Sequence, residues 1–338
     1  MSRGKAVFSD LSSLIGAIDR GLSLVSGRRL SILIFHRVHA QADPLFPGEL
    51  DATRFRTLMA FVARTFRVVS LSEAVDGLRE GNLTAGSVAI TFDDGYRDNL
   101  EVAAPILQSL GLPATCFVAS GFLDGGNMWN DRVVEAIRHG EPTVGEMVRC
   151  VSGLANGLDL GGVVNDRAQL CRQLLYALKY LPSEARMNAV ERLESAIGLP
   201  PFHAPLMMSP EQVRALRSGG WEIGAHTVSH PILKNVGDEA AYNEIFQSKS
   251  RLEGILGESV RFFAYPNGKP NRDYRRRDVA FVRECGFEAA VSTAWGSARP
   301  GDSLYELPRF TPWDAQVNRF GLRMVVARRR HAYDRAAS

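Results

Sequence analysis

The stretch SVAITFDDG at residues 87–95 joins a short apolar run to two adjacent carboxylates. Residues 87–92 are rich in β-branched and aromatic side chains, and a run of this length is typical of a buried strand. Asp93 and Asp94 follow where that strand ends, and Gly95 allows the chain to turn sharply behind them. Polar groups at the ends of buried strands are typical of α/β folds, so the stretch predicts such a fold with a site at this edge.

The same alternation of short apolar runs and helical periodicity continues along the chain. Further strands are predicted at residues 31–38, 114–119, 221–225, 260–265 and 288–292. Between them, helices are predicted at residues 52–65, 71–80, 98–110, 210–217, 240–256 and 277–285. Ser209, Pro210 and Gln212 have the signature of a capped helix start. This order of elements indicates right-handed βαβ units and predicts a parallel sheet or barrel.

Residues 129–205 interrupt this rhythm. Leucines at helical spacing predict one helix there, and a second helix is predicted to begin at a Ser183 cap and to end at Gly198. The apolar faces of both helices are typical of packing surfaces. We interpret the segment as a helical insertion in a domain that spans residues 30–315.

The two ends of the chain extend beyond this domain. Residues 1–29 are interpreted as a helical extension, with a mildly amphipathic helix at residues 8–24, and residues 316–338 as a basic tail with solvated arginines. The first basic residues are not followed by the clean apolar core of a signal peptide, so a cytoplasmic location is expected. Peripheral contact with a membrane, or with a lipid-linked substrate, stays open.

The composition is that of a globular protein, with 45% hydrophobic and 23% charged residues. With 40 basic and 37 acidic residues, the formal net charge is +3, which is too balanced to indicate nucleic-acid binding. The four cysteines lack CxxC or any other metal-ligand spacing. The sequence therefore predicts neither a thiolate metal site nor a need for an oxidising compartment.

Two further polar segments follow predicted strands. The stretch GAHTVSHP, residues 224–231, contains two histidines four residues apart, a spacing that lets both converge on one ion. The stretch FFAYPNGK, residues 262–269, runs from an apolar strand into a tight turn. A divalent cation would relieve the repulsion between Asp93 and Asp94 and leave one of them as a base. The alternative interpretation of the first stretch is an ordinary turn with solvated aspartates, and that of the third stretch is simply a turn.

In this order, the segments resemble the polysaccharide deacetylase family, also called the NodB-homology or carbohydrate esterase family 4 enzymes. Residues 91–95 match its TFDDG motif, residues 226–230 match its H-[ST]-x-x-H motif, and the third segment matches loosely. The resemblance spans residues 31–312. It implies a distorted (β/α) barrel with fewer than eight repeats and one divalent cation, usually Zn²⁺. It also implies roles for four side chains, with Asp94, His226 and His230 as metal ligands and Asp93 as the general base.

The chain departs from the commonest pattern of the family in its proton donor. No late Leu-x-His segment supplies an acid, whereas FHRV at residues 35–38 ends the first predicted strand. This segment resembles the early histidine segment of a permuted branch that includes poly-N-acetylglucosamine deacetylases. The resemblance implies that His36 is the general acid. The alternative is a histidine that only ends a strand, with His39 as a nearby candidate.

Other candidate residues surround the expected substrate. The family often has an arginine where this chain has Ala264, and Arg309 is a candidate to replace it from another strand end. The backbone N–H of Asn267 is the positional candidate to stabilise an oxyanion. Trp295 is a candidate wall for the acetyl methyl group, and Tyr96 is a candidate platform for a sugar ring.

The sequence thus predicts a metal-dependent hydrolase that removes N-acetyl groups from a saccharide during assembly of a surface polysaccharide or glycoconjugate. Zn²⁺ is the expected metal, although Co²⁺, Ni²⁺ and Fe²⁺ accept the same ligands. Two alternatives remain. One is a hydrolase of a small non-sugar amide or ester on the same fold, and the other is a carbohydrate-binding relic without activity.

Overall fold

The computed structural model describes residues 15–18, 21, 28–152, 164–198, 205–312, 314, 316–329 and 333–336. The chain divides into two compact units. The first consists of Met1–Gln41, Gly48–Asp124 and Met208–Ser338, and the second consists of Ala42–Pro47 and Gly125–Met207. The predicted insertion, residues 129–205, lies within the second unit.

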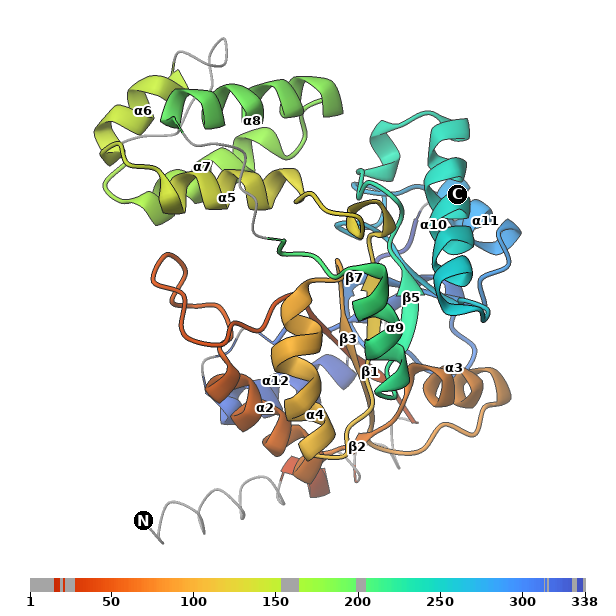
Figure 1. Ribbon diagram of the computed structural model, residues 1–338. Coiled ribbons are helices and arrows are strands. Elements are labelled where there is room, and N and C mark those ends of the chain that lie inside the picture. Colours follow the sequence, from red (N-terminus) through yellow and green to blue (C-terminus); the bar gives the residue numbers. More distant parts are fainter. Residues whose placement is uncertain are drawn as a thin grey trace, which may run out of the picture. The chain divides into compact units, whose positions relative to one another are not determined.

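A parallel sheet forms the centre of the first unit (Figure 1). Its strands pair in the order β1 (Ser31–Phe35), β3 (Ser87–Phe92), β4 (Thr115–Val118), β5 (Glu222–Ala225), β6 (Phe262–Ala264), β7 (Ala289–Trp295) and β8 (Leu307–Arg309). The short β2 (Arg67–Val68) also pairs with β3. After β8, Phe310 donates its N–H to Ile32 at 2.7 Å and accepts from the N–H of Ile34 at 3.1 Å. These bonds bring the last strand back to the first, which confirms the predicted distorted (β/α) barrel.

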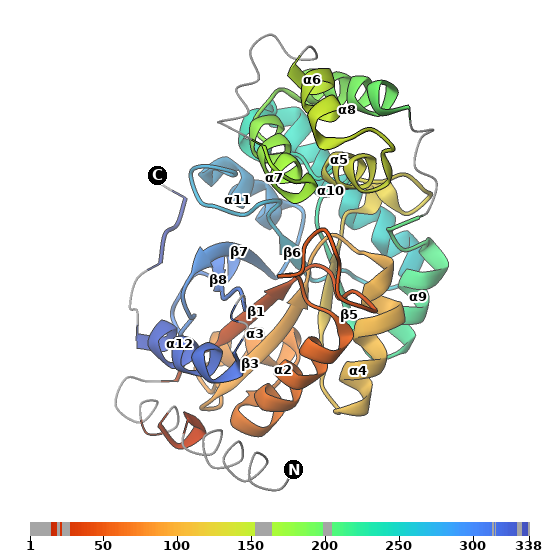
Figure 2. The ribbon, with the colours of Figure 1, turned by 90° about the vertical axis from the view of Figure 1, so that its left-hand side faces the viewer.

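Helices surround this barrel (Figure 2). They are α2 (Ala52–Thr65), α3 (Leu71–Glu80), α4 (Ala104–Ser109), α9 (Pro210–Ser218), α10 (Asp238–Leu256), α11 (Arg276–Glu284) and α12 (Val317–Arg329). Single turns occur at η1 (Asn99–Ala103), η2 (Ser120–Phe122), η3 (Leu233–Asn235) and η4 (Leu304–Glu306). Capping by side chains fixes several starts, since Asp51 caps α2, Ser70 caps α3, and Ser209 with Gln212 forms the predicted capping box of α9.

Alternating side chains along the strands fill two separate apolar clusters. Along β1, Ile32 belongs to a cluster that gathers side chains from β3, β4, β6, β7 and β8 and therefore fills the barrel interior. Leu33 and Phe35 belong to a second cluster, between the strands and the outer helices. The period of two along each strand produces both layers from one sequence.

Helix α3 closes the amino end of the barrel. Its side chains Leu71, Val75 and Leu78 belong to the interior cluster. Its first N–H groups donate to the Glu222 carboxylate at the start of β5, at 3.0 Å from Leu71 and 3.2 Å from Ser72. Arg79 reaches Glu288, just before β7, at 3.2 Å. The candidate functional residues therefore lie at the carboxyl end of the barrel.

The second unit is a group of helices with its own apolar cluster. It contains α5 (Trp129–His139), α6 (Val144–Ser152), α7 (Arg167–Leu178) and α8 (Ser183–Ile197). The predicted leucine stripe is buried at Leu170, Leu174 and Leu178. The prediction of a Ser183 cap is wrong by one residue, because Pro182 has the extended cap geometry and Ser183 is already helical. Gly198 ends α8 in the left-handed conformation, as predicted.

The carboxyl-terminal segment differs from the solvated tail expected from its arginines. Helix α12 buries Phe320 and Met324 in the outer cluster. Arg328 is 4% exposed and donates to the carbonyl oxygens of Ser87 at 2.8 Å and Arg29 at 3.3 Å. The prediction is wrong for this arginine because two backbone acceptors replace water around its guanidinium.

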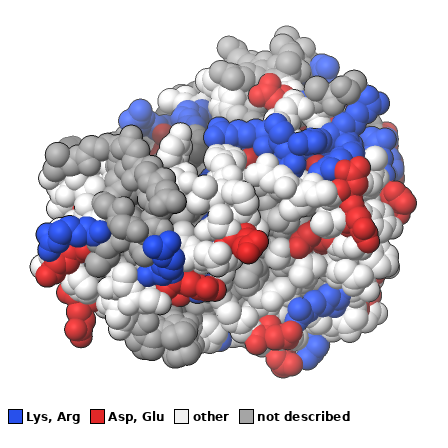
Figure 3. All heavy atoms as spheres, turned by 90° about the horizontal axis from the view of Figure 1, so that it is seen from above, with Lys and Arg blue, Asp and Glu red and all other residues white. Residues whose placement is uncertain are grey.

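The amino-terminal prediction falls mainly outside the described residues. Of the predicted helix at residues 8–24, the structure describes 15–18, which are helical, and 21. No helix in the described part of the chain combines the length and the apolar character needed to cross a membrane. On the face shown in Figure 3, basic and acidic side chains both occur, so neither sign of charge occupies that face alone.

Candidate metal-binding and catalytic site

The two aspartates follow β3 at the carboxyl end of the barrel. The N–H of Asp93 donates to the carbonyl of Phe35 on β1 at 2.9 Å, and Asp94 has a left-handed backbone with φ of 76°. Gly95 has φ of 89°, and a Cβ there would lie 3.0 Å from Cγ1 of Val118. This turn therefore needs glycine, and it holds both carboxylates in the interior, at 2% and 5% exposure.

Both histidines of the second motif face Asp94. The Nε2 atoms of His226 and His230 each lie 3.4 Å from Asp94 Oδ1, and one ligand atom from each of the three residues lies within 4.8 Å of the others. His226 Nδ1 lies 2.7 Å from the carbonyl of Ala264, which assigns the ring proton to Nδ1 and leaves the Nε2 lone pair free. Asp94 Oδ1 is buried and has no hydrogen-bond partner among the residues described. One orphaned carboxylate oxygen between two imidazole nitrogens fits a divalent cation.

The lowered pKa values of Asp94 and His230 suit the same interpretation. Burial opposes ionisation of Asp94, but the adjacent imidazoles of His226 and His230 hold its pKa well below the usual range. Burial lowers the pKa of His230 to about 4, so this ring is neutral at pH 7. Burial also disfavours the charged form of His226, but the nearby charges of Asp93 and Asp94 raise its pKa. A carboxylate and imidazole groups are the ligands that Zn²⁺ prefers.

Asp93 is held by an arginine from the opposite end of the sequence. Arg309 donates from its two terminal nitrogens to the two oxygens of Asp93, each at 2.7 Å. Its Nε donates to the carbonyl of Ser292 at 2.8 Å, and the guanidinium is 1% exposed. Burial opposes ionisation of Asp93, but the charge of Arg309 holds its pKa below the usual value. The bidentate pair fixes the orientation of the carboxylate and keeps it ionised.

A glutamate on α10 holds the loop between the two histidines. Glu244 Oε2 accepts from the N–H groups of Val228 and Ser229, each at 2.8 Å, and Oε1 accepts from the Ser229 hydroxyl at 2.6 Å. Thr227 and His230 have left-handed φ values of 65° and 55°. The carboxylate therefore stabilises a strained loop that presents both imidazoles. Glu244 was not predicted from the sequence, since a lone glutamate in a helix carries no signal of this contact.

Side chains after β3 also hold the end of β1. Asn99 Nδ2 donates to the carbonyl of His36 at 2.8 Å. Asp98 accepts from Arg37 Nε at 2.8 Å and from the N–H of Val38 at 3.2 Å. These bonds replace sheet pairing, so β1 ends at Phe35 rather than at residue 38 as predicted. The His36 side chain is exposed at this end of the barrel.

The remaining candidates lie at different depths around this end. Asn267 is half-buried and has a left-handed φ of 59°. Trp295 packs on Phe310, with ring centroids 6.1 Å apart. Tyr96 is 3% exposed, and the Arg37 guanidinium lies 4.8 Å from the centre of its ring. Their contacts with a substrate stay predictions.

Comparison with known sequences decides the family. A sequence model described as polysaccharide deacetylase matches residues 80–149 and 172–290, more than half of the chain. The chain belongs to this family. The resemblance of its TFDDG and H-[ST]-x-x-H segments is thereby confirmed at the level of the family.

Solved structures of similar proteins share the fold. IcaB from Ammonifex degensii has 19% identity and a TM-score of 0.57, with 87% of this chain and 97% of that chain covered. A deacetylase of Streptococcus pyogenes, PplD in complex with acetate, has 19% identity and a TM-score of 0.54, with 84% and 92% covered. The putative polysaccharide deacetylase YxkH of Bacillus subtilis is 22% identical over 102 residues, which are 30% of this chain. That match spans about a third (35%) of the length of this relative.

Proposed function

We propose that the protein is a metal-dependent N-deacetylase that hydrolyses the N-acetyl group of a saccharide, in the assembly of a surface polysaccharide or glycoconjugate. One observation carries the proposal. The unpartnered oxygen of Asp94 faces His226 and His230, beside an Asp93 carboxylate that Arg309 holds in one orientation. A cation site next to a fixed, ionised base is what amide hydrolysis requires.

Asp94, His226 and His230 would hold the cation, with Zn²⁺ as the expected ion. When bound, the ion supplies a Lewis acid that lowers the pKa of water and polarises the acetyl carbonyl. Three protein ligands suit a catalytic rather than a structural zinc site, because structural sites usually have four. The bond from His226 Nδ1 to the Ala264 carbonyl keeps this ligand in the required tautomer.

The protein groups divide the proton transfers between them. Asp93 accepts the proton of the attacking water, and the Arg309 pair keeps the carboxylate ionised and directed. The backbone N–H of Asn267 would stabilise the oxyanion. His36 donates a proton to the departing sugar amine. Its proximity is consistent with this role, since its charge lowers the pKa of Asp93 and of Asp94.

The test is acetate release from N-acetylated oligosaccharides by zinc-reconstituted protein, with metal content measured on the same samples. Acetate is expected from the wild type, is expected to disappear with chelation and to return with Zn²⁺. An Asp93→Asn variant that retains zinc should release none. Absence of acetate from chito-oligosaccharides and lipid-linked sugars, with stoichiometric metal, would overturn the proposal. Acetate from a small non-sugar amide alone would identify the alternative hydrolase.

A further inference from the structure

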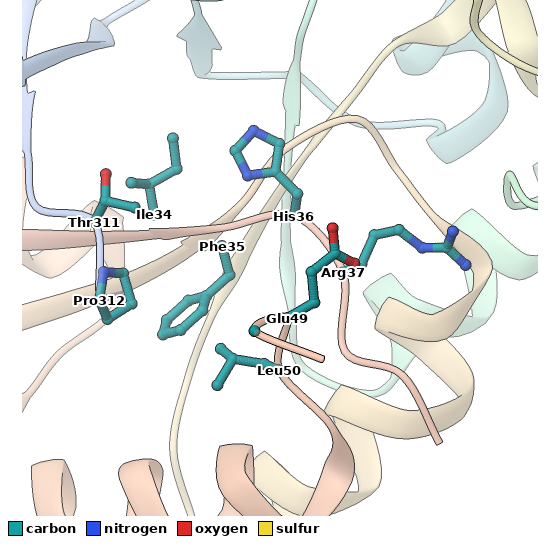
Figure 4. Close-up of a pocket in the computed structure, with 9 residues that line it drawn as sticks. Ile34, Phe35, His36, Arg37, Glu49, Leu50, Thr311 and Pro312 are labelled. Carbon is teal, nitrogen blue, oxygen red and sulfur yellow. The ribbon is translucent and has the colours of Figure 1, made fainter. Parts of the chain in front are cut away.

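A pocket of about 290 Å³ opens beside His36 in the first unit. It lies where the end of β1 meets the chain that follows β8 (Figure 4). Its lining combines apolar side chains with a few polar ones, and consists of Ile34, Phe35, His36, Arg37, Gly48, Glu49, Leu50, Thr311 and Pro312. Figure 4 shows the Arg37 side chain directed away from Thr311 and Pro312.

The polar wall of this pocket is held in place before any ligand binds. His39 Nε2 lies 2.6 Å from Glu49 Oε2, within hydrogen-bonding distance. The carbonyl of Glu49 accepts from Arg54 at 3.0 Å, and the carbonyl of Leu50 accepts from the N–H of His39 at 2.9 Å. The Glu49 side chain nevertheless remains 48% exposed, so its carboxylate can accept further hydrogen bonds.

The position of the pocket relates it to the proposed reaction. Its lining includes His36 but neither Asp93 nor the three proposed metal ligands. In the proposed reaction the acetamide is bound at Asp93 and the cation ligands, so it lies outside the pocket. If His36 protonates the sugar amine, a longer substrate also passes His36, and the pocket that His36 lines is within its reach.

We propose that the pocket binds the sugar unit next to the one that is deacetylated, and that the Glu49 carboxylate accepts hydrogen bonds from its hydroxyl groups. The inference rests on the proposed function, which supplies the saccharide substrate. The volume is at the lower end of the range of about 300–1,000 Å³ for small-molecule sites, so it suits one sugar unit. A carboxylate, a hydroxyl and an imidazole above apolar side chains match a ring with polar edges and C–H faces. An acyl chain would offer these polar groups no hydrogen bonds in place of those that they make with water.

A bulky substitution at Gly48 would block the pocket. It has open space around the position of a Cβ and an ordinary φ, so Gly48→Trp introduces bulk without backbone strain. Gly254 on α10 is exposed and has the same open surroundings, which makes Gly254→Trp the matched control. Glu49→Gln keeps the size of the side chain and removes its charge.

The experiment compares kcat/KM for tetra-N-acetylchitotetraose and for N-acetylglucosamine. Gly48→Trp should lower the ratio of these two values at least tenfold relative to Gly254→Trp. Glu49→Gln should raise KM for the tetrasaccharide about tenfold with kcat little changed, because hydrogen bonds to a charged group are strong. An unchanged ratio and an unchanged KM would overturn the proposal.

Binding separates this inference from the proposed function. The tetrasaccharide is titrated calorimetrically into zinc-loaded Asp93→Asn protein. Adding Gly48→Trp to this protein should raise the Kd at least tenfold, and adding Gly254→Trp should not change it. If the wild type releases no acetate but the two tryptophan variants still differ in Kd, the proposed reaction is refuted and the proposed sugar pocket is retained. If the wild type releases acetate but the Kd is equal in both tryptophan variants, or no tetrasaccharide binds, the proposed role of the pocket is refuted.

Discussion

The two ends of the barrel are formed by the same strands, yet they bury opposite kinds of side chain. At the amino end, Ile32 and Leu307 pack with α3 in an apolar cluster. At the carboxyl end, the same two strands lead to His36 and Arg309, and β3 leads to Asp93. Apolar burial stabilises the first end without specific geometry, whereas the buried charge of Asp93 at the second end is tolerated because Arg309 pairs with it.

This difference predicts that the amino end of the barrel determines stability and that the carboxyl end determines the reaction. Changes at the amino end should alter unfolding and leave the reaction of folded molecules unaffected. Changes at the carboxyl end should alter the reaction, and should alter stability only where a buried polar or charged group loses its partner. Four variants test this division.

The largest effect is expected from Arg309→Met. The variant leaves Asp93 buried without its guanidinium, which should cost about 3–5 kcal/mol of unfolding free energy and at least about a hundredfold in kcat. Urea unfolding and acetate release measure the two effects. The double variant Asp93→Asn/Arg309→Met should regain stability but not activity. Full activity in Arg309→Met would refute the role of the pair.

Ile32→Ala tests the amino end. Removal of a fully buried side chain from the interior cluster should cost about 2–5 kcal/mol, and the control Ile32→Val only about 0.5–1.5 kcal/mol. Thermal unfolding measures the loss, and acetate release well below the melting temperature should match the wild type per folded molecule. A fall in kcat similar to that of Arg309→Met would contradict the separation of the two ends.

Asn99→Ala tests the support of His36. Loss of the bond to the His36 carbonyl should cost about 1 kcal/mol of stability and lower kcat about tenfold through misplacement of the ring, with zinc content unchanged. Asn82→Ala removes an exposed amide that bonds Glu80 and is the control. Equal kcat in the two variants would show that Asn99 has no positioning role.

Glu288→Gln should have the smallest effect. The hydrogen bond from Arg261, at 2.7 Å, lowers the pKa of Glu288 to about 2 despite partial burial. A lowered folded pKa stabilises the protein above the ordinary value near 4.5, and this contribution is lost as the pH falls toward 2. The melting temperature of the variant should therefore be slightly lower at pH 7, with a smaller difference at pH 3. A pH-independent difference would contradict the ion pair.

Sequence patterns located the elements with strong local signals. The strand at residues 87–92 and the helices at 52–65 and 71–80 are confirmed to the residue, because alternation, caps and a left-handed Gly81 mark their ends. The three-residue β8 was not predicted. It contains Pro308 and has no periodicity of its own, so only pairing with β7 and the return of Phe310 to β1 define it.

The residues of the site also divide into those that local sequence patterns predict and those that only the tertiary fold brings together. The two motifs identified the residues that meet as a cluster, Asp94, His226 and His230, because each motif places its side chains locally. The pairing of Arg309 with Asp93 depends on closure of the barrel, which no local pattern specifies. Asp98 and Asn99 stood beside the first motif, but their contacts with β1 require the tertiary fold.

The bond between Asp93 and Arg309 also has a consequence for synthesis, since it joins residues 216 positions apart. Because the chain grows from its amino end, the ribosome adds Asp94, His226 and His230 well before it adds Arg309. A nascent chain can thus assemble the proposed cation ligands while Asp93 is still without its arginine. Contacts this distant in sequence form late and slowly. The proposed hydrolysis would thereby be reserved for chains whose last strand has joined the first, and activity would report the completion of folding.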